Sequence, residues 1–193
     1  SKPKKQIVFW LENTIPEQFR NAIREGILLW NDAFEKIGFK DAIIVKQMPD
    51  DADWDPADVR YNTIRWIITP GGGYAVGPSR ANPYTGEIYD ADIRISSDYV
   101  RWFGREFDEW VTPLSFSDSE NHIEDEESSI NTFEQFSQLY SCYFADGMMD
   151  QMEFGWSLLE SRGLVSNEDL EQFINDGLID LVAHEVGHTL GLR

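Results

Sequence analysis

Cysteine, long apolar runs and basic residues are all scarce in this sequence, and each scarcity excludes a class of protein. Cysteine occurs once, at Cys142, so no disulfide can form within the chain. No run of about 18 apolar residues is present, so we expect no membrane-spanning helix. Basic residues number 16 against 35 acidic ones, and the resulting formal charge of −19 would repel nucleic-acid phosphates. We therefore expect neither a nucleic-acid partner nor a membrane span.

Proline and glycine are limited to 8 and 14 of the 193 residues, whereas hydrophobic residues make up 41% of the chain. This composition excludes collagen-like, low-complexity and disordered proteins. A chain of this length commonly forms one domain with a substantial core. We therefore expect residues 1–193 to form a single globular domain.

The apolar pattern of the first half predicts an α/β fold, which can also be described as α+β. Short apolar or β-branched runs predict strands at residues 6–12, 42–48, 63–69 and 87–96. Between positions 16 and 37, apolar residues recur at spacings of three and four, which predicts one long amphipathic helix after the first strand. A short stretch containing a proline, at 74–79, predicts an antiparallel edge strand, so the mixed, twisted sheet would have about five strands.

Helices are predicted for much of the second half. Aromatic residues from Phe133 to Trp156, together with Leu159, follow helical spacing. Ser166 is followed three residues later by Asp169, which is the arrangement of a capping box, so a helix should begin there. We expect residues 175–177 to interrupt this helix and a separate final helix to span residues 178–190.

The final predicted helix carries the strongest chemical signal in the sequence. His184 and His188 are four residues apart, so both imidazoles lie on one helical face and can converge on a single tetrahedral cation. Glu185 lies beside them and can reach a water held by that cation, as a general base must. The competing interpretation, two histidines satisfied on a buried helix face, leaves Glu185 unexplained.

Two glycines in this helix have structural interpretations. Gly187 predicts close packing of the helix against a neighbouring strand. Gly191 predicts a left-handed helix end, which would let the chain reverse and bring a further ligand back to the metal.

The sequence from His184 to Gly191 resembles the extended zinc-binding consensus of the metzincin metalloproteases. In that family a third histidine ligand follows the glycine by three positions, which is one position beyond Arg193. The resemblance implies a zincin-like fold in which residues 1–193 form the N-terminal subdomain, ending in the zinc helix, and the C-terminal subdomain lies outside the chain. The expected cofactor is Zn²⁺.

Residues 77–95 are similar, more narrowly, to large bacterial zinc-dependent metalloproteases that are exported. This similarity implies an extracytoplasmic location, either periplasmic, outer-membrane-associated or secreted. It also implies that the remaining domains of a longer parent protein are partners of this one.

The resemblance implies a metalloendopeptidase that hydrolyses peptide bonds. Zn²⁺ would polarise the scissile carbonyl and lower the pKa of its bound water to about 7, with Glu185 as the general base. A peptide or protein substrate would lie along the edge strand at Tyr74, Ala75, Val76 and Gly77 as an added β-strand. With two histidines instead of three protein ligands, the 193-residue form is expected to be inactive or nearly so.

Two alternatives stay open at this point. A gluzincin-type peptidase would take its third ligand from a glutamate further along the chain, and Gly191 argues against it. A binding module that retains a relic zinc helix would not hydrolyse peptides, and Glu185 argues against it because a structural site does not need this carboxylate.

Four other patterns have simpler explanations than a ligand site. His122 lies among acidic residues and is expected in a solvated loop, and the run of glycines at 71–73 is expected in a turn. The alternating aspartates at positions 51–55 predict a turn or a helix cap instead of a calcium loop. Asp90 and Asp92 are expected to be solvated at a sheet edge, although they could bind calcium.

Overall fold

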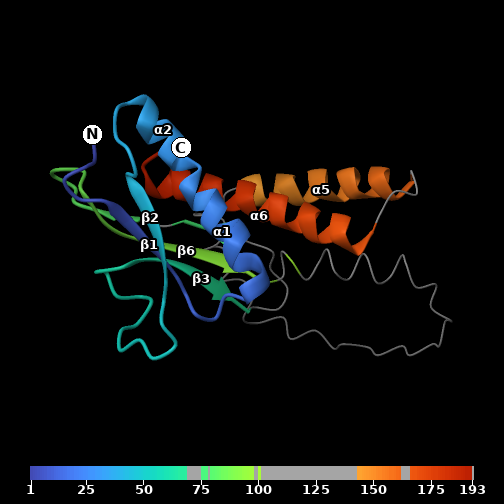
Figure 1. The fold of residues 1–193 in the computed structure, drawn as a ribbon, viewed down its shortest axis with the longest axis horizontal. Helices are drawn as coiled ribbons and strands as arrows, with labels where there is room; N and C mark the ends of the chain where they lie inside the picture. Colours follow the sequence, from blue (N-terminus) through green and yellow to red (C-terminus); the bar gives the residue numbers. More distant parts are fainter. Residues whose placement is uncertain (69–74, 78, 98–99, 101–142, 162–165, 193) are drawn as a thin grey trace, which may run out of the picture.

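A computed structural model describes residues 1–68, 75–77, 79–97, 100, 143–161 and 166–192 of the chain. The predicted α/β fold is confirmed: a mixed, mostly parallel sheet is combined with helices (Figure 1). The described residues form six strands: β1 (Ile7–Leu11), β2 (Ile43–Gln47), β3 (Asn62–Ile67), β4 (Ala75–Val76), β5 (Ser79–Ala81) and β6 (Ile88–Ser96). The helices are α1 (Glu17–Leu28), α2 (Trp30–Lys36), α5 (Tyr143–Ser161) and α6 (Asn167–Thr189).

The central sheet is parallel and ends in the predicted antiparallel edge strand. Its order is β2-β1-β3-β6-β4, and strands β2, β1, β3 and β6 run parallel to one another. Strand β4 pairs antiparallel with β6 through Ala75 opposite Ile95 and Val76 opposite Arg94. Strand β5 also pairs antiparallel with β6, nearer the N-terminal end of that strand. The predicted edge strand at 74–79 therefore corresponds to β4 and the start of β5, while Tyr74 and the glycines at 71–73 lie outside the described residues.

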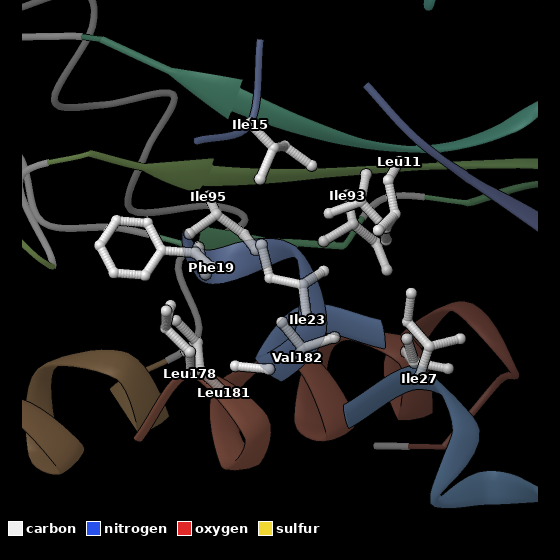
Figure 2. Packing of buried hydrophobic residues seen from close by; sticks show 14 of the residues in the cluster. Leu11, Ile15, Phe19, Ile23, Ile27, Ile93, Ile95, Leu178, Leu181 and Val182 are labelled. Atoms are coloured by element: carbon white, nitrogen blue, oxygen red, sulfur yellow. The ribbon is translucent and has the colours of Figure 1, made fainter. Parts of the chain in front are cut away.

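The core lies between the sheet and a layer formed by α1 and α6 (Figure 2). Ile23 and Ile27 of α1 are fully buried, as are Leu178 and Val182 of α6. The two helices approach very closely at Gly26, where a Cβ atom would lie 2.6 Å from the carbonyl oxygen of Ile179. Helix α6 is therefore anchored to the fold along its length by burial of apolar side chains, the dominant favourable term in folding.

Two predicted helix boundaries were wrong. The long helix after β1 is divided at Leu29, where the Asp32 N–H donates to the Leu29 carbonyl in a tighter, three-residue turn. Conversely, α6 continues through residues 175–177 without interruption. Burial of Ile174 and Leu178 on either side outweighs the propensity penalty of Gly177, which is about 1 kcal/mol.

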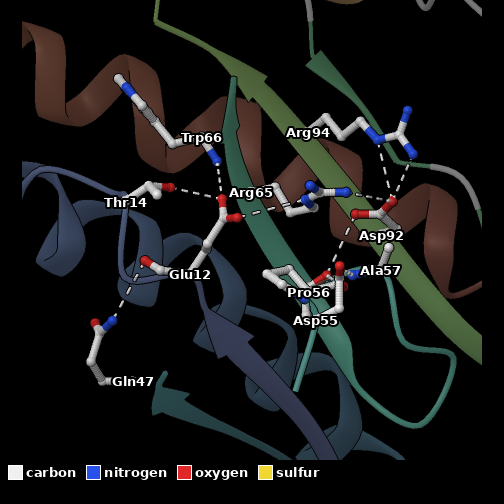
Figure 3. A network of polar contacts seen from close by, with 11 residues as sticks. Glu12, Thr14, Gln47, Asp55, Pro56, Ala57, Arg65, Trp66, Asp92 and Arg94 are labelled. Atoms are coloured by element: carbon white, nitrogen blue, oxygen red, sulfur yellow. Dashed lines mark hydrogen bonds and ion pairs between the residues drawn. The ribbon is translucent and has the colours of Figure 1, made fainter. Parts of the chain in front are cut away.

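A network of charged side chains crosses β1, β3 and β6 (Figure 3). Glu12, just after β1, accepts hydrogen bonds from the Trp66 backbone N–H (3.0 Å) and the Thr14 hydroxyl (2.8 Å). Arg65 lies between the carboxylates of Glu12 (3.8 Å) and Asp92 (3.7 Å). Arg94 donates to Asp92 at 2.8 Å. The network ties three parallel strands together.

The expectation that Asp90 and Asp92 are solvated was wrong. Their exposed fractions are only 3% and 6%, because the neighbouring strands and the arginines cover them. Asp90 pairs with Arg80 at 3.3 Å, and burial raises the pKa of Asp90, an effect that Arg80 opposes. Asp55, in contrast, behaves as predicted for a turn, since its carboxylate accepts the Ala57 N–H at 2.7 Å (Figure 3).

None of the helices in the described ranges has the length and apolar character needed to cross a membrane.

Candidate metal centre

Helix α6, which carries the histidines, begins as the sequence predicts. The Asp169 N–H donates to the Ser166 hydroxyl at 3.2 Å, and the Ser166 N–H donates to the Asp169 carboxylate at 2.8 Å. These reciprocal bonds form the capping box, and the hydrogen bonds from Ser166 lower the pKa of Asp169. The start of α6 is thus fixed by its own local sequence.

The end of α6 also has the predicted left-handed glycine. Gly191 has φ of 92°, its N–H donates to the His188 carbonyl, and the Leu192 N–H donates to the Gly187 carbonyl, each at 3.0 Å. This pair of bonds is a Schellman motif, in which a glycine satisfies the last helical carbonyls and turns the chain. The turn directs Leu192 back towards the histidine face of the helix.

The structure brings the two histidines together at this end of α6. The imidazole centroids of His184 and His188 are 4.4 Å apart, with an angle of 86° between the ring planes. The Nδ1 atom of His188 is 3.0 Å from the Leu192 carbonyl oxygen, which can only accept. Nδ1 must therefore carry the proton in this contact, and the neutral tautomer has its lone pair on Nε2. A backbone carbonyl that fixes the tautomer in this way is typical of metal-binding histidines.

Phe144, at the start of α5, stacks on His184. The ring centroids are 3.8 Å apart and the ring planes are within 4° of parallel. Burial lowers the pKa of His184, and the neighbouring His188 lowers it further. Both effects favour the neutral imidazole, which is the form that binds metal. Sequence reasoning missed Phe144 because helical spacing groups it with core aromatics and does not show which residue it contacts.

Glu185 is fully buried between α6 and the edge strand. Its exposed fraction is 0%, and within the described part of the chain neither carboxylate oxygen has a hydrogen-bond partner. Burial is the main cause that raises the pKa of Glu185, while His188 and the Gly77 backbone act in the opposite direction. The Gly77 amide is thus near the carboxylate without meeting the geometry of a hydrogen bond. A buried carboxylate with no donor has unused capacity to accept one from a water or another ligand.

The edge strand contacts the helix at the predicted substrate-binding residues. A Cβ atom at Gly77 would lie 2.7 Å from the Glu185 carbonyl oxygen and 3.0 Å from its Oε2 atom, so only glycine fits there. Ala75 is buried against the core, and the backbone of Val76 pairs with β6. Of the predicted substrate-binding residues, Gly77 is the one that the structure shows in close contact with the candidate catalytic residue.

Gly187 packs against a helix, so the expectation that it packs against a strand was wrong. A Cβ atom there would be 2.8 Å from Cζ2 of Trp30, in α2, and the Trp30 indole N–H donates to the Ala183 carbonyl at 2.8 Å. The tryptophan thus holds α6 one residue before His184. Sequence spacing could not reveal this contact because 153 positions separate the bonded residues.

The donors fit a zinc site in part. Two imidazoles beside a carboxylate without a described hydrogen-bond donor are suitable chemistry, but the described ranges contain no cluster of three histidine, cysteine or acidic side chains able to hold a metal ion. His122 lies outside these ranges. A third protein ligand is still required for a catalytic zinc site.

Comparisons with known proteins give no further support: no family model matches the chain, and no curated protein or solved structure matches it either. The metzincin resemblance stays a prediction from the motif.

Proposed function

We propose that this chain is the zinc-binding part of a metalloendopeptidase, with His184 and His188 as metal ligands and Glu185 as the general base. The observation that carries the proposal is the geometry at the end of α6. Two imidazoles 4.4 Å apart lie beside a buried carboxylate whose oxygens have no described donor, and the tautomer of His188 is set by a backbone carbonyl.

Each residue has a role that follows from its surroundings. His184 and His188 donate nitrogen lone pairs, and the stacking of Phe144 restricts rotation of the His184 ring. Bound zinc would supply Lewis acidity, which polarises the scissile carbonyl and acidifies water. Glu185 accepts a proton from the attacking water and returns it to the leaving amine; burial favours this exchange because it brings the carboxylate pKa nearer to neutrality.

The remaining parts of the proposal rest on the metzincin resemblance. The third ligand would follow Gly191 by three positions, and the Schellman turn supports it by reversing the chain at that glycine. The substrate would add to the edge strand near Gly77 through main-chain hydrogen bonds. An extracytoplasmic location and association with further domains of a longer protein also belong to the proposal.

Metal binding can be tested on the chain as it is. Competitive titration with a chromophoric chelator should show one weak zinc site that is lost in His184→Ala and in His188→Ala. His122→Ala is the matched control, since it removes the third histidine of the chain and should leave the affinity unchanged. Unchanged zinc binding in both α6 variants would contradict the proposed ligands.

Catalysis can be tested by adding one histidine after Arg193. The added imidazole should strengthen zinc binding and produce peptide cleavage that the unextended chain lacks. Glu185→Gln in the same background should retain zinc and lose cleavage, because the amide cannot accept the proton. Stoichiometric zinc without any cleavage of a mixed peptide library would instead favour the non-catalytic binding module.

A further inference from the structure

Two aspartates continue the histidine face along α6. Asp176 and Asp180 precede His184 by eight and four residues, so Asp176, Asp180, His184 and His188 follow one another at a spacing of four. Residues four apart on a helix are neighbours on one face. Both aspartates are exposed, and neither forms an ion pair with a described residue.

Helix α5 runs beside α6 (Figure 1), and side chains of the two helices line a groove. The groove has a volume of about 300 Å³. Its lining residues come from both helices: Met148, Gln151 and Met152 of α5, and Phe173, Asp176, Gly177 and Asp180 of α6. Met148 is one turn along α5 from Phe144, which stacks on His184, and Asp180 is one turn along α6 from His184 itself. The groove therefore begins about one helical turn from His184.

The lining combines apolar surface with two carboxylates. Met148, Met152 and Phe173 present thioether and aromatic surface, while Asp176 and Asp180 each add a negative charge. A lysine or arginine side chain matches both parts, since its aliphatic stem covers apolar surface and its charged end meets carboxylates. An acidic side chain would be repelled, and a purely apolar one would leave the carboxylates without a counter-charge.

We propose that the groove between α5 and α6 is a specificity pocket that binds an arginine or lysine side chain of the peptide substrate, with Asp176 and Asp180 as its charge-recognition residues. The inference rests on the proposed peptidase function, because it is the closeness of the groove to His184 that makes its occupant a substrate side chain. If the groove is this pocket, the peptidase prefers peptides with a basic residue close to the scissile bond.

The test measures binding to the metal-free chain, so it does not depend on turnover. Two fluorescent hexapeptides are compared by anisotropy at low ionic strength, identical except that one has a central arginine and the other citrulline, its neutral isostere. Each exposed ion pair contributes modestly, so the arginine peptide should bind about two- to tenfold more tightly. This preference should decrease as salt is added.

Variants assign the preference to the groove. The double variant Asp176→Asn/Asp180→Asn should bind both peptides with the same affinity. The control Glu168→Gln/Glu171→Gln removes the same charge from exposed positions of the same helix that do not line the groove, and it should keep the preference. Because all four side chains are exposed, folding should be preserved in both variants.

Two results would overturn the proposal: equal affinity for the arginine and citrulline peptides, or an equal loss of preference in both double variants. The second would mean that the overall charge of −19 attracts the peptide without a specific pocket. Failure of the peptidase function would appear separately, as missing zinc binding or cleavage, and would leave the measured peptide preference intact. Conversely, cleavage without any preference for basic residues would refute the pocket alone.

Discussion

The imidazole of His184 contacts two other rings, and the contact with Phe144 leads to a prediction. Phe144→Ala removes a parallel stack with a centroid distance of 3.8 Å and lets the His184 ring rotate. Aromatic pairs contribute about 0.5–1.5 kcal/mol, so zinc should bind roughly two- to tenfold more weakly. Competitive zinc titration measures this change.

A second phenylalanine on α5 provides the control. Phe154 has an exposed fraction of 71%, so Phe154→Ala removes a similar side chain from the same helix away from the histidines. Zinc affinity should be unaffected by it. Equal weakening in both variants would mean that α5 acts through its general stability and that Phe144 does not position His184.

The contact between Gly77 and Glu185 predicts that a single methyl group disturbs the site. In Gly77→Ala the new Cβ would lie 2.7 Å from the Glu185 carbonyl oxygen, so the edge strand or the carboxylate must shift. Overpacking of this kind lowers the free energy of unfolding by about 1–3 kcal/mol. Gly147→Ala is the control. Gly147 lies in α5, and a Cβ atom added there would have no described neighbouring atom within 4 Å, so this variant should have unchanged or increased stability. Urea unfolding of both variants checks the contrast.

The candidate site was only partly predictable from the sequence. Helical spacing was enough to place His184 and His188 on one face, because that contact is local. The burial of Glu185 and its contact with Gly77 depend on how α6 docks against the edge strand, more than 100 positions away along the chain. Phe144 and Trp30 were not assigned to the site for the same reason, since no spacing rule links residues on different helices.

The capping box at the start of α6 gives a pH-dependent prediction for that element. Asp169 accepts two hydrogen bonds from Ser166, which lowers its pKa in the folded protein. A lowered pKa means that the carboxylate stabilises the fold above the unfolded-state pKa, near 3.8, and that this contribution is lost as pH falls through the folded-state pKa. Asp169→Asn should therefore reduce stability at neutral pH and have progressively less effect in acid.

Chemical denaturation of wild type and Asp169→Asn across this pH range provides the measurement. Glu171→Gln serves as the control, because it removes a carboxylate from the same helix beyond the cap. A stability difference for Asp169→Asn that is constant from neutral to strongly acidic pH would contradict the charge-assisted cap.

Among the elements, the strands were predicted better than the helix boundaries. Strands β1, β2, β3 and β6 were located closely, because compact β-branched and aromatic runs have few other stable conformations. The errors concern positions where local signals and packing disagree. Gly177 looks like a helix stop in isolation, yet the burial of Ile174 and Leu178 carries α6 through it. The burial of Asp90 and Asp92 was unpredictable because alternating polar residues look the same whether water or arginines face them.

For the whole molecule, the two faces of the sheet are stabilised by different interactions. The face towards α1 and α6 is apolar, whereas the network of Glu12, Arg65 and Asp92 connects β1, β3 and β6 by charge (Figure 3). Glu12 and Asp92 are both more than nine-tenths buried, and Arg65 lies between them. Arg94 also pairs with Asp92, but of these two arginines it is Arg65 that contacts both carboxylates, so the arrangement of the three parallel strands is expected to depend on Arg65.

Arg65→Met tests this dependence, because methionine keeps an unbranched apolar stem while removing the charge. Breaking a buried pair costs about 3–5 kcal/mol, and the 23% exposure of the Arg65 side chain together with its 3.7–3.8 Å contacts reduces the expected loss to about 2 kcal/mol. Arg60→Met is the control, since its partner Asp58 is paired at the surface and little change is expected. If both variants unfold at the same urea concentration, the network does not hold the strands together, and apolar packing against α1 and α6 alone accounts for the stability of the sheet.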